Sequence, residues 1–261
     1  MSRLAQLHPR RFFLETWRDI NEEHLSAAHG RRFDYKVLVV LVVAAVSLTL
    51  MEYWGDRTTF LDLFPNRRMP YWDLKSFGYW SVCRFLGYAA IPAITVALLP
   101  GERLRDYGLS FKGFFSHAWI YVVLFSLVAP MIVLVSFTDD FRTYYPFYEE
   151  AGRSGFDFWV WEGLYALQFL SLEFFFRGYL LHALKKTMGA YAIFVMVVPY
   201  CMIHFGKPFL EALAAIAAGV VLGTLALKTR SIWCGVLIHV SVAISMDVAA
   251  LVQRGEILWT P

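Results

Sequence analysis

Long apolar stretches recur along the whole chain, and they constrain its fold more than any other feature. An α-helix of about 17–25 apolar residues is long enough to cross the hydrocarbon core of a membrane. Candidate spans lie at roughly 37–54, 79–99, 117–137, 157–182, 191–206, 209–227 and 231–252. The sequence therefore predicts an all-α fold, a polytopic membrane bundle of about seven transmembrane helices.

The composition agrees with a membrane protein. Hydrophobic residues make up 58% of the chain and charged residues 17%, whereas soluble domains average about 45–50% and about 25%. The net charge of +3 gives no reason to expect a nucleic-acid partner, so the expected partner is the lipid bilayer, and the oligomeric state is left open. The cysteines, Cys83, Cys201 and Cys234, lie singly in apolar stretches, which argues against a disulfide or zinc framework.

Two segments are predicted. Residues 1–35 are polar and arginine-rich, and "FFLETWRDINEEHL" within them is typical of an amphipathic surface helix. Residues 36–261 form one membrane domain without internal repeats, and no removable signal peptide is expected. Lys and Arg concentrate in the loops on the side of the N-terminus, so the positive-inside rule predicts that this terminus is cytoplasmic.

Ionisable residues inside the predicted spans are the main functional signal. They are Arg84, Glu162, Glu173, Arg177, His182, His204, His239 and Asp247. A charge at the centre of a membrane costs about 2.5–3.5 kcal/mol on insertion scales, and such residues usually face the bundle interior. With a rise of about 1.5 Å per residue, Glu173 and His239 lie roughly 12–13 Å from the cytoplasmic ends of their spans and His204 roughly 20 Å.

A carboxylate and two imidazoles in a site of low dielectric constant suit two hydrolytic chemistries. Glu173, His204 and His239 would hold a divalent metal such as zinc, or they would activate a water molecule by acid–base catalysis. Arg177, one turn after Glu173, would hold the carboxylate ionised and in place. The alternative is structural, with Glu173 and Arg177 as an ion pair between helices. Arg84, Glu162 and Asp247 share another depth and form a second, structural group by hypothesis.

Three blocks carry a resemblance to a known family. "EFFFRG", "YCMIHFGKP" and "GTLALKTRSIWCGVLIHV" resemble the motifs of the CPBP intramembrane endopeptidases, the CAAX protease and bacteriocin-processing (Abi) family, over residues 157–252. The resemblance implies a hydrolase of membrane-associated or lipidated proteins or peptides. It implies that Glu173, Arg177, His204 and His239 are the site residues, and it favours a bacterial inner membrane.

Two positions depart from the family pattern. Leu172 replaces the first Glu of the family's pair, and Ala243 replaces the Asn four residues after the last His. Either Glu173 has taken over as base or ligand, or the protein is catalytically inactive. Possible substitutes are Ser241, Ser245, Asp247 and Glu211. The alternative function is therefore a non-catalytic membrane protein of the CPBP fold, a bacteriocin-immunity factor or a sorting partner.

Overall fold

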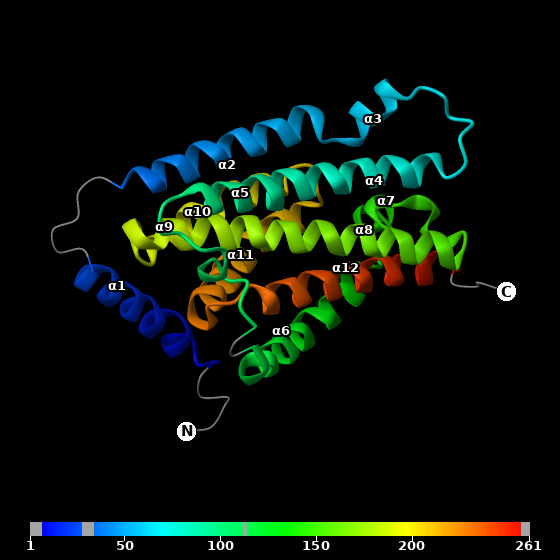
Figure 1. The fold of residues 1–261 in the computed structure, drawn as a ribbon. Helices are drawn as coiled ribbons and strands as arrows, with labels where there is room; N and C mark the ends of the chain where they lie inside the picture. Colours follow the sequence, from blue (N-terminus) through cyan, green and yellow to red (C-terminus); the bar gives the residue numbers. More distant parts are fainter. Residues whose placement is uncertain (1–6, 28–33, 112–113, 257–261) are drawn as a thin grey trace. The chain divides into compact units, whose positions relative to one another are not determined.

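The computed structural model describes residues 7–27, 34–111 and 114–256, and the regular elements of these ranges are all helical (Figure 1). The predicted all-α fold is therefore confirmed. Residues 1–6 and 28–33 of the predicted N-terminal segment lie outside the described residues.

Five helical stretches are long and apolar enough to cross a membrane. They are Tyr35–Trp54 (α2), Trp72–Leu98 (α4, η3 and α5), His117–Val135 in α6, Phe209–Thr229 (α11) and Trp233–Arg254 (α12). These helices confirm the polytopic bundle, but the predicted count of seven is not confirmed. A further apolar helix, α10 (Tyr191–Met202), is shorter. In α8 (Gly155–Glu173) the acidic residues Asp157 and Glu162 interrupt the apolar run.

The predicted span 157–182 consists of consecutive helical segments of different pitch. Helix α8 ends at Glu173, η6 (Phe174–Leu180) is a π-helix, and α9 (Leu181–Met188) continues the chain. A π-helical segment is rare and often marks a functional site. All seven residues of η6 are buried, so the wide turn begins directly after Glu173 and within the protein interior.

The predicted span 191–206 is too long at its C-terminal end. Helix α10 ends at Met202, and a turn over residues 203–207 follows. Gly206 in this turn has a φ of 89°, which glycine adopts without the steric cost of a side chain. Pro208 then directly precedes α11. His204 therefore lies in a turn rather than in a helix, and its predicted depth does not apply.

The chain divides into two compact units. Unit 1 comprises Met1–Ala45, Pro92–Phe115 and Phe174–Trp233, and unit 2 comprises Val46–Ile91, Ser116–Glu173 and Cys234–Pro261. The boundaries between the units fall within continuous helical stretches. One of them lies between Glu173, the last residue of α8, and Phe174, the first residue of η6.

In unit 1 the predicted amphipathic segment is helical and packs against other helices. It comprises η2 (Arg10–Glu15) and α1 (Thr16–Ala27), and α1 contacts α9 and α11. The Trp17 indole N–H donates to Thr224 Oγ1 at 3.0 Å, and the Ala190 N–H donates to Asn21 Oδ1 at 2.8 Å. Polar contacts thus fix the register of α1 on its neighbours.

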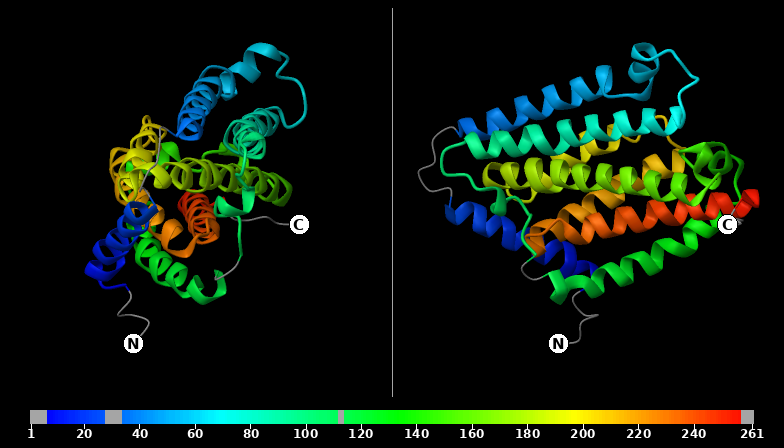
Figure 2. Two further views of the ribbon diagram at one scale, coloured as in Figure 1. Left: turned by 60° about the vertical axis from the view of Figure 1, so that its left-hand side comes forward. Right: turned by 45° about the vertical axis from the view of Figure 1, so that its right-hand side comes forward.

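In unit 2 helix α4 (Trp72–Phe85) packs along α8, as Figure 2 shows. Their interface is aromatic, with Phe77, Trp80, Trp161 and Tyr165 in one buried cluster. The Ser81 hydroxyl donates to the Leu164 carbonyl at 2.7 Å across the same interface. Close packing of these large rings, together with this hydrogen bond, stabilises the contact on this side of α8.

The second predicted group of charged residues, Arg84, Glu162 and Asp247, forms only in part. The Trp161 indole donates to Asp247 Oδ2 at 2.6 Å, and the Glu162 and Asp247 carboxylates are close enough to interact electrostatically. Arg84 instead lies near the rings of Trp80 and Tyr88, at 6.0 and 5.8 Å from their centroids. The two acids on α8 and α12 thus meet, whereas the contacts of Arg84 are aromatic.

Candidate functional site

Two of the predicted site residues meet in unit 2. Glu173 is the last residue of α8, and His239 lies in α12. His239 Nδ1 is 2.7 Å from Glu173 Oε1, and the two side chains are 14% and 1% exposed. The distance is short enough for an ion pair when His239 is protonated, in a site almost closed to solvent.

Gly235 and Phe169 hold this pair in place. Gly235 lies one turn before His239, and a Cβ atom added there would be 2.9 Å from the carboxyl carbon of Glu173. Phe169 lies one turn before Glu173, and its ring is parallel to the His239 imidazole, with 5.4 Å between centroids. The absence of a side chain at Gly235 therefore leaves room for the carboxylate, and Phe169 orients the imidazole. Sequence reasoning missed both residues, although the spacing of four residues in each helix places them on the same faces.

The pair has a defined acid–base character. In a neutral imidazole one nitrogen carries the proton and the other accepts one. When Nδ1–H donates to the Glu173 carboxylate, Nε2 is the nitrogen that takes up a proton, and the carboxylate stabilises the imidazolium that results. Glu173 and His239 together thus have the chemistry of a general base with an orienting carboxylate.

The other two predicted site residues meet in unit 1, through Tyr200. The Arg177 side chain is completely buried, and its guanidinium carbon lies 3.9 Å from the centroid of the Tyr200 ring. The Tyr200 and His204 rings are 4.8 Å apart, and His204 Nδ1 is 2.8 Å from the Tyr200 carbonyl oxygen. A cation–π contact of this kind holds a buried guanidinium better than an ammonium.

The blocks "EFFFRG" and "YCMIH" are thus packed together at Tyr200, and Glu173 pairs with the block around His239. Glu173 and His239 belong to unit 2, whereas Arg177 and His204 belong to unit 1. The predicted role of Arg177 as the holder of Glu173, and the grouping of His204 with Glu173 and His239, stay predictions.

The comparison with family models matches the segment that contains all four residues. Residues 154–245 match the model described as type II CAAX prenyl endopeptidase Rce1-like. The resemblance to the CPBP family is confirmed. Comparisons with curated proteins and with solved structures give no match. At the family level the chain is thus similar to CAAX-type intramembrane proteases, and with its apolar helices it is an integral membrane protein.

The two departures from the CPBP pattern are both packed in the interior. Leu172 and Ala243 are each 4% exposed, and Ala243 belongs to the aromatic cluster of unit 2. The positions of the family's first Glu and of its Asn are therefore filled by apolar packing, and Glu173 with His239 are the acid–base groups that the structure brings together in unit 2.

The residues considered as substitutes all have structural contacts. Ser241 lies 2.8 Å from the Tyr121 hydroxyl, Ser245 donates to the Ser241 carbonyl at 2.7 Å, Asp247 accepts from Trp161, and Glu211 pairs with Lys207 at 2.6 Å. These contacts account for the side chains without a catalytic role.

No group of three or more His, Cys, Asp or Glu side chains suited to a metal ion is found among the described residues. Within unit 2, Glu173 and His239 provide two donors, and these face one another. A divalent metal such as zinc on Glu173, His204 and His239 therefore stays a prediction from the sequence.

Proposed function

We propose that this CPBP-type chain is an intramembrane endopeptidase that hydrolyses a peptide bond of a membrane-associated or lipidated protein or peptide. The observation that supports this proposal is the contact of 2.7 Å between Glu173 and His239, inside the Rce1-like segment. In keeping with the sequence, we propose a bacterial inner membrane and a cytoplasmic N-terminus.

The first step forms a nucleophile from water. His239 Nε2 takes one proton from a water molecule while the water oxygen bonds to the carbonyl carbon of the substrate. The Glu173 carboxylate stabilises the imidazolium that forms, and no net charge has to be brought into the site. In this scheme His239 is the base and Glu173 orients it, because the family's first Glu is Leu172 here.

The second step breaks the peptide bond. The tetrahedral intermediate collapses as its C–N bond breaks, and His239 returns its proton to the leaving nitrogen. The products are a carboxyl terminus and an amino terminus, and the pair is restored. His204 and Arg177 remain site residues that the resemblance implies, and neither step requires them.

A non-catalytic CPBP-type membrane protein is the second candidate. The burial of Leu172 and Ala243 favours it, because two positions that are polar in the family pattern carry apolar side chains in the interior. In that case the Glu173–His239 pair would be a structural link between α8 and α12.

The decisive experiment compares protein termini in membranes. Cells that make the wild-type chain, Glu173→Gln or no chain would be compared for processed N- and C-termini. Gln keeps the size of the side chain but cannot stabilise an imidazolium, so we expect cleavage to fall by about 10²- to 10⁴-fold.

Glu162→Gln is the matched control. Glu162 is a second buried glutamate of α8, 4% exposed, and it takes no part in the proposed chemistry. Cleavage at the wild-type level in Glu173→Gln, with Glu162→Gln equally active, would reject the catalytic role of Glu173. Identical termini with and without the chain would favour the non-catalytic candidate.

A further inference from the structure

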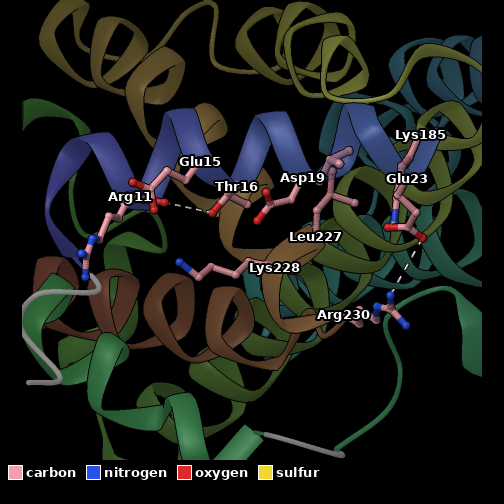
Figure 3. A pocket seen from close by; sticks show the side chains of 10 residues that line it. Arg11, Glu15, Thr16, Asp19, Glu23, Lys185, Leu227, Lys228 and Arg230 are labelled. Carbon is pink, nitrogen blue, oxygen red and sulfur yellow. Dashed lines mark hydrogen bonds and ion pairs between the residues drawn. The ribbon is translucent and has the colours of Figure 1, made fainter. Parts of the chain in front are cut away.

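A polar hollow of about 370 Å³ lies in unit 1 between the N-terminal helical segment and the C-terminal end of α11 (Figure 3). One wall is formed by η2 and α1, and the facing wall by the end of α11 and the residues after it. The proposed hydrolysis uses no residue of this hollow.

The two walls carry opposite charge. Glu15, Asp19 and Glu23 follow one another at intervals of four residues, which places them on one face of the helix. Lys228 and Arg230 lie across from them, as Figure 3 shows. Arg11 of η2 also lines the hollow, so the wall with the three carboxylates carries one cation, and the facing wall is basic.

One end of the hollow is closed by its own ion pairs. Glu23 Oε2 is 3.0 Å from Lys185 Nζ, and Glu23 Oε1 is 3.9 Å from an Arg230 guanidinium nitrogen. At this end the carboxylate of Glu23 is therefore neutralised by Lys185 and Arg230.

The other end is open. Within the described part of the chain, Lys228 and Glu15 form no ion pair within 4.0 Å, and Lys228 Nζ lies 5.3 Å from the centroid of the Phe12 ring. Asp19 has one contact with the exposed Arg18, at 4.0 Å. A half-buried ammonium thus faces two carboxylates across a space wide enough for a small polar group.

The position of Lys228 suggests what fills this space. Helix α11 is long and apolar enough to cross a membrane and ends at Thr229, so Lys228 in its last turn is expected at the depth of lipid headgroups. A group that carries a phosphate and an ammonium a few ångströms apart matches a wall with Lys228 and a wall with Glu15 and Asp19.

We propose that this hollow binds the headgroup of an ethanolamine phospholipid, with the phosphate on Lys228 and the ammonium on Glu15 and Asp19. A primary ammonium donates three hydrogen bonds to the carboxylates, whereas the trimethylammonium of choline donates none. The site therefore selects ethanolamine over choline lipids, and zwitterionic over purely anionic lipids.

The experiment measures lipid binding to the purified full-length protein by native mass spectrometry. Phosphatidylethanolamine, phosphatidylcholine and phosphatidylglycerol are added separately in detergent. We expect wild type to bind the ethanolamine lipid about tenfold more tightly than the choline lipid, Asp19→Asn to remove this preference, and Lys228→Gln to weaken the binding of both lipids.

Two exposed residues provide controls. Glu22 is on the same helix with its side chain 68% exposed, and Arg105 is 70% exposed, so Glu22→Gln and Arg105→Gln should keep the preference. Equal binding of ethanolamine and choline lipids, or tighter binding of phosphatidylglycerol, would overturn the proposal. If free phosphoethanolamine binds as tightly as the lipid, the proposal that the hollow binds a lipid is overturned.

Discussion

At the scale of single residues, Gly235 decides how closely α12 approaches the Glu173 carboxylate. The space that a side chain would occupy at Gly235 is taken by the carboxyl group. The carboxylate is the flexible end of its side chain, so a larger residue at position 235 would displace Glu173 rather than the backbone. Displacement by about 1 Å is enough to break the contact of 2.7 Å between Glu173 Oε1 and His239 Nδ1.

Gly235→Ala is therefore expected to keep the fold and lose cleavage. We expect turnover to fall at least about tenfold, because catalytic groups act only in the right geometry, while the midpoint of thermal unfolding stays close to that of the wild type. Both are measured on the purified protein with a peptide that the comparison of termini identifies.

Gly163→Ala in α8 is the control, since a Cβ atom there would meet no atom within 4 Å. It should leave turnover unchanged. A Gly235→Ala protein that cleaves like the wild type would show that the Glu173 carboxylate does not need its place beside Gly235.

Helix spacing and motif blocks led to Glu173 and His239 in the sequence, because a charge in an apolar helix is conspicuous. Gly235 and Phe169 could not be found in this way. A glycine and a phenylalanine are common in apolar helices, and their role depends on contacts between α8 and α12 that one sequence does not contain.

At the scale of elements, Glu102 links the beginning of α2 to the end of α9. Its carboxylate accepts hydrogen bonds from Lys36 Nζ at 3.2 Å, from the Tyr107 hydroxyl at 3.0 Å and from Lys186 Nζ. Burial by itself would raise the pKa of Glu102, but the interactions with Lys186, Tyr107 and Lys36 outweigh burial and lower this pKa below its ordinary value.

This shift predicts a pH dependence of stability. A carboxyl group with a lowered pKa stabilises the fold above its ordinary pKa of about 4.5, and this contribution is lost as the pH falls through the lower value of the folded state. We therefore expect wild type to unfold at a higher temperature than Glu102→Gln at pH 7, and the difference to vanish in acid.

Asp106→Asn is the matched control in the same segment, because the Asp106 side chain is 59% exposed. It should show no comparable difference at pH 7. A difference between wild type and Glu102→Gln that persists unchanged into acid would contradict the role of the charge.

The ends of the elements were less predictable than their existence. Apolar runs located the ends of α2, α11 and α12 to within two residues, but the span predicted at 79–99 begins at Trp72. The end of α10 at Met202 depends on Gly206 and Pro208. The π-helix after Glu173 has no signal in an apolar run, since its wide turn follows from packing against neighbouring helices.

At the scale of the whole molecule, hydropathy predicted the all-α membrane bundle, because the bilayer leaves a chain few other ways to satisfy its backbone. It did not settle the number of spans. Helix α8 carries Glu173 and is not among the five stretches that are apolar enough to cross a membrane, so hydropathy describes this element of the site least well.

The most direct test of the central claim is a double-mutant cycle on cleavage. Turnover would be measured in proteoliposomes for wild type, Glu173→Gln, His239→Gln and the double variant. Because residues that act as one unit are strongly non-additive, we predict that the double variant is no slower than the slower single variant. Losses that multiply in the double variant, or a single variant with wild-type turnover, would contradict the claim that Glu173 and His239 act as a catalytic pair.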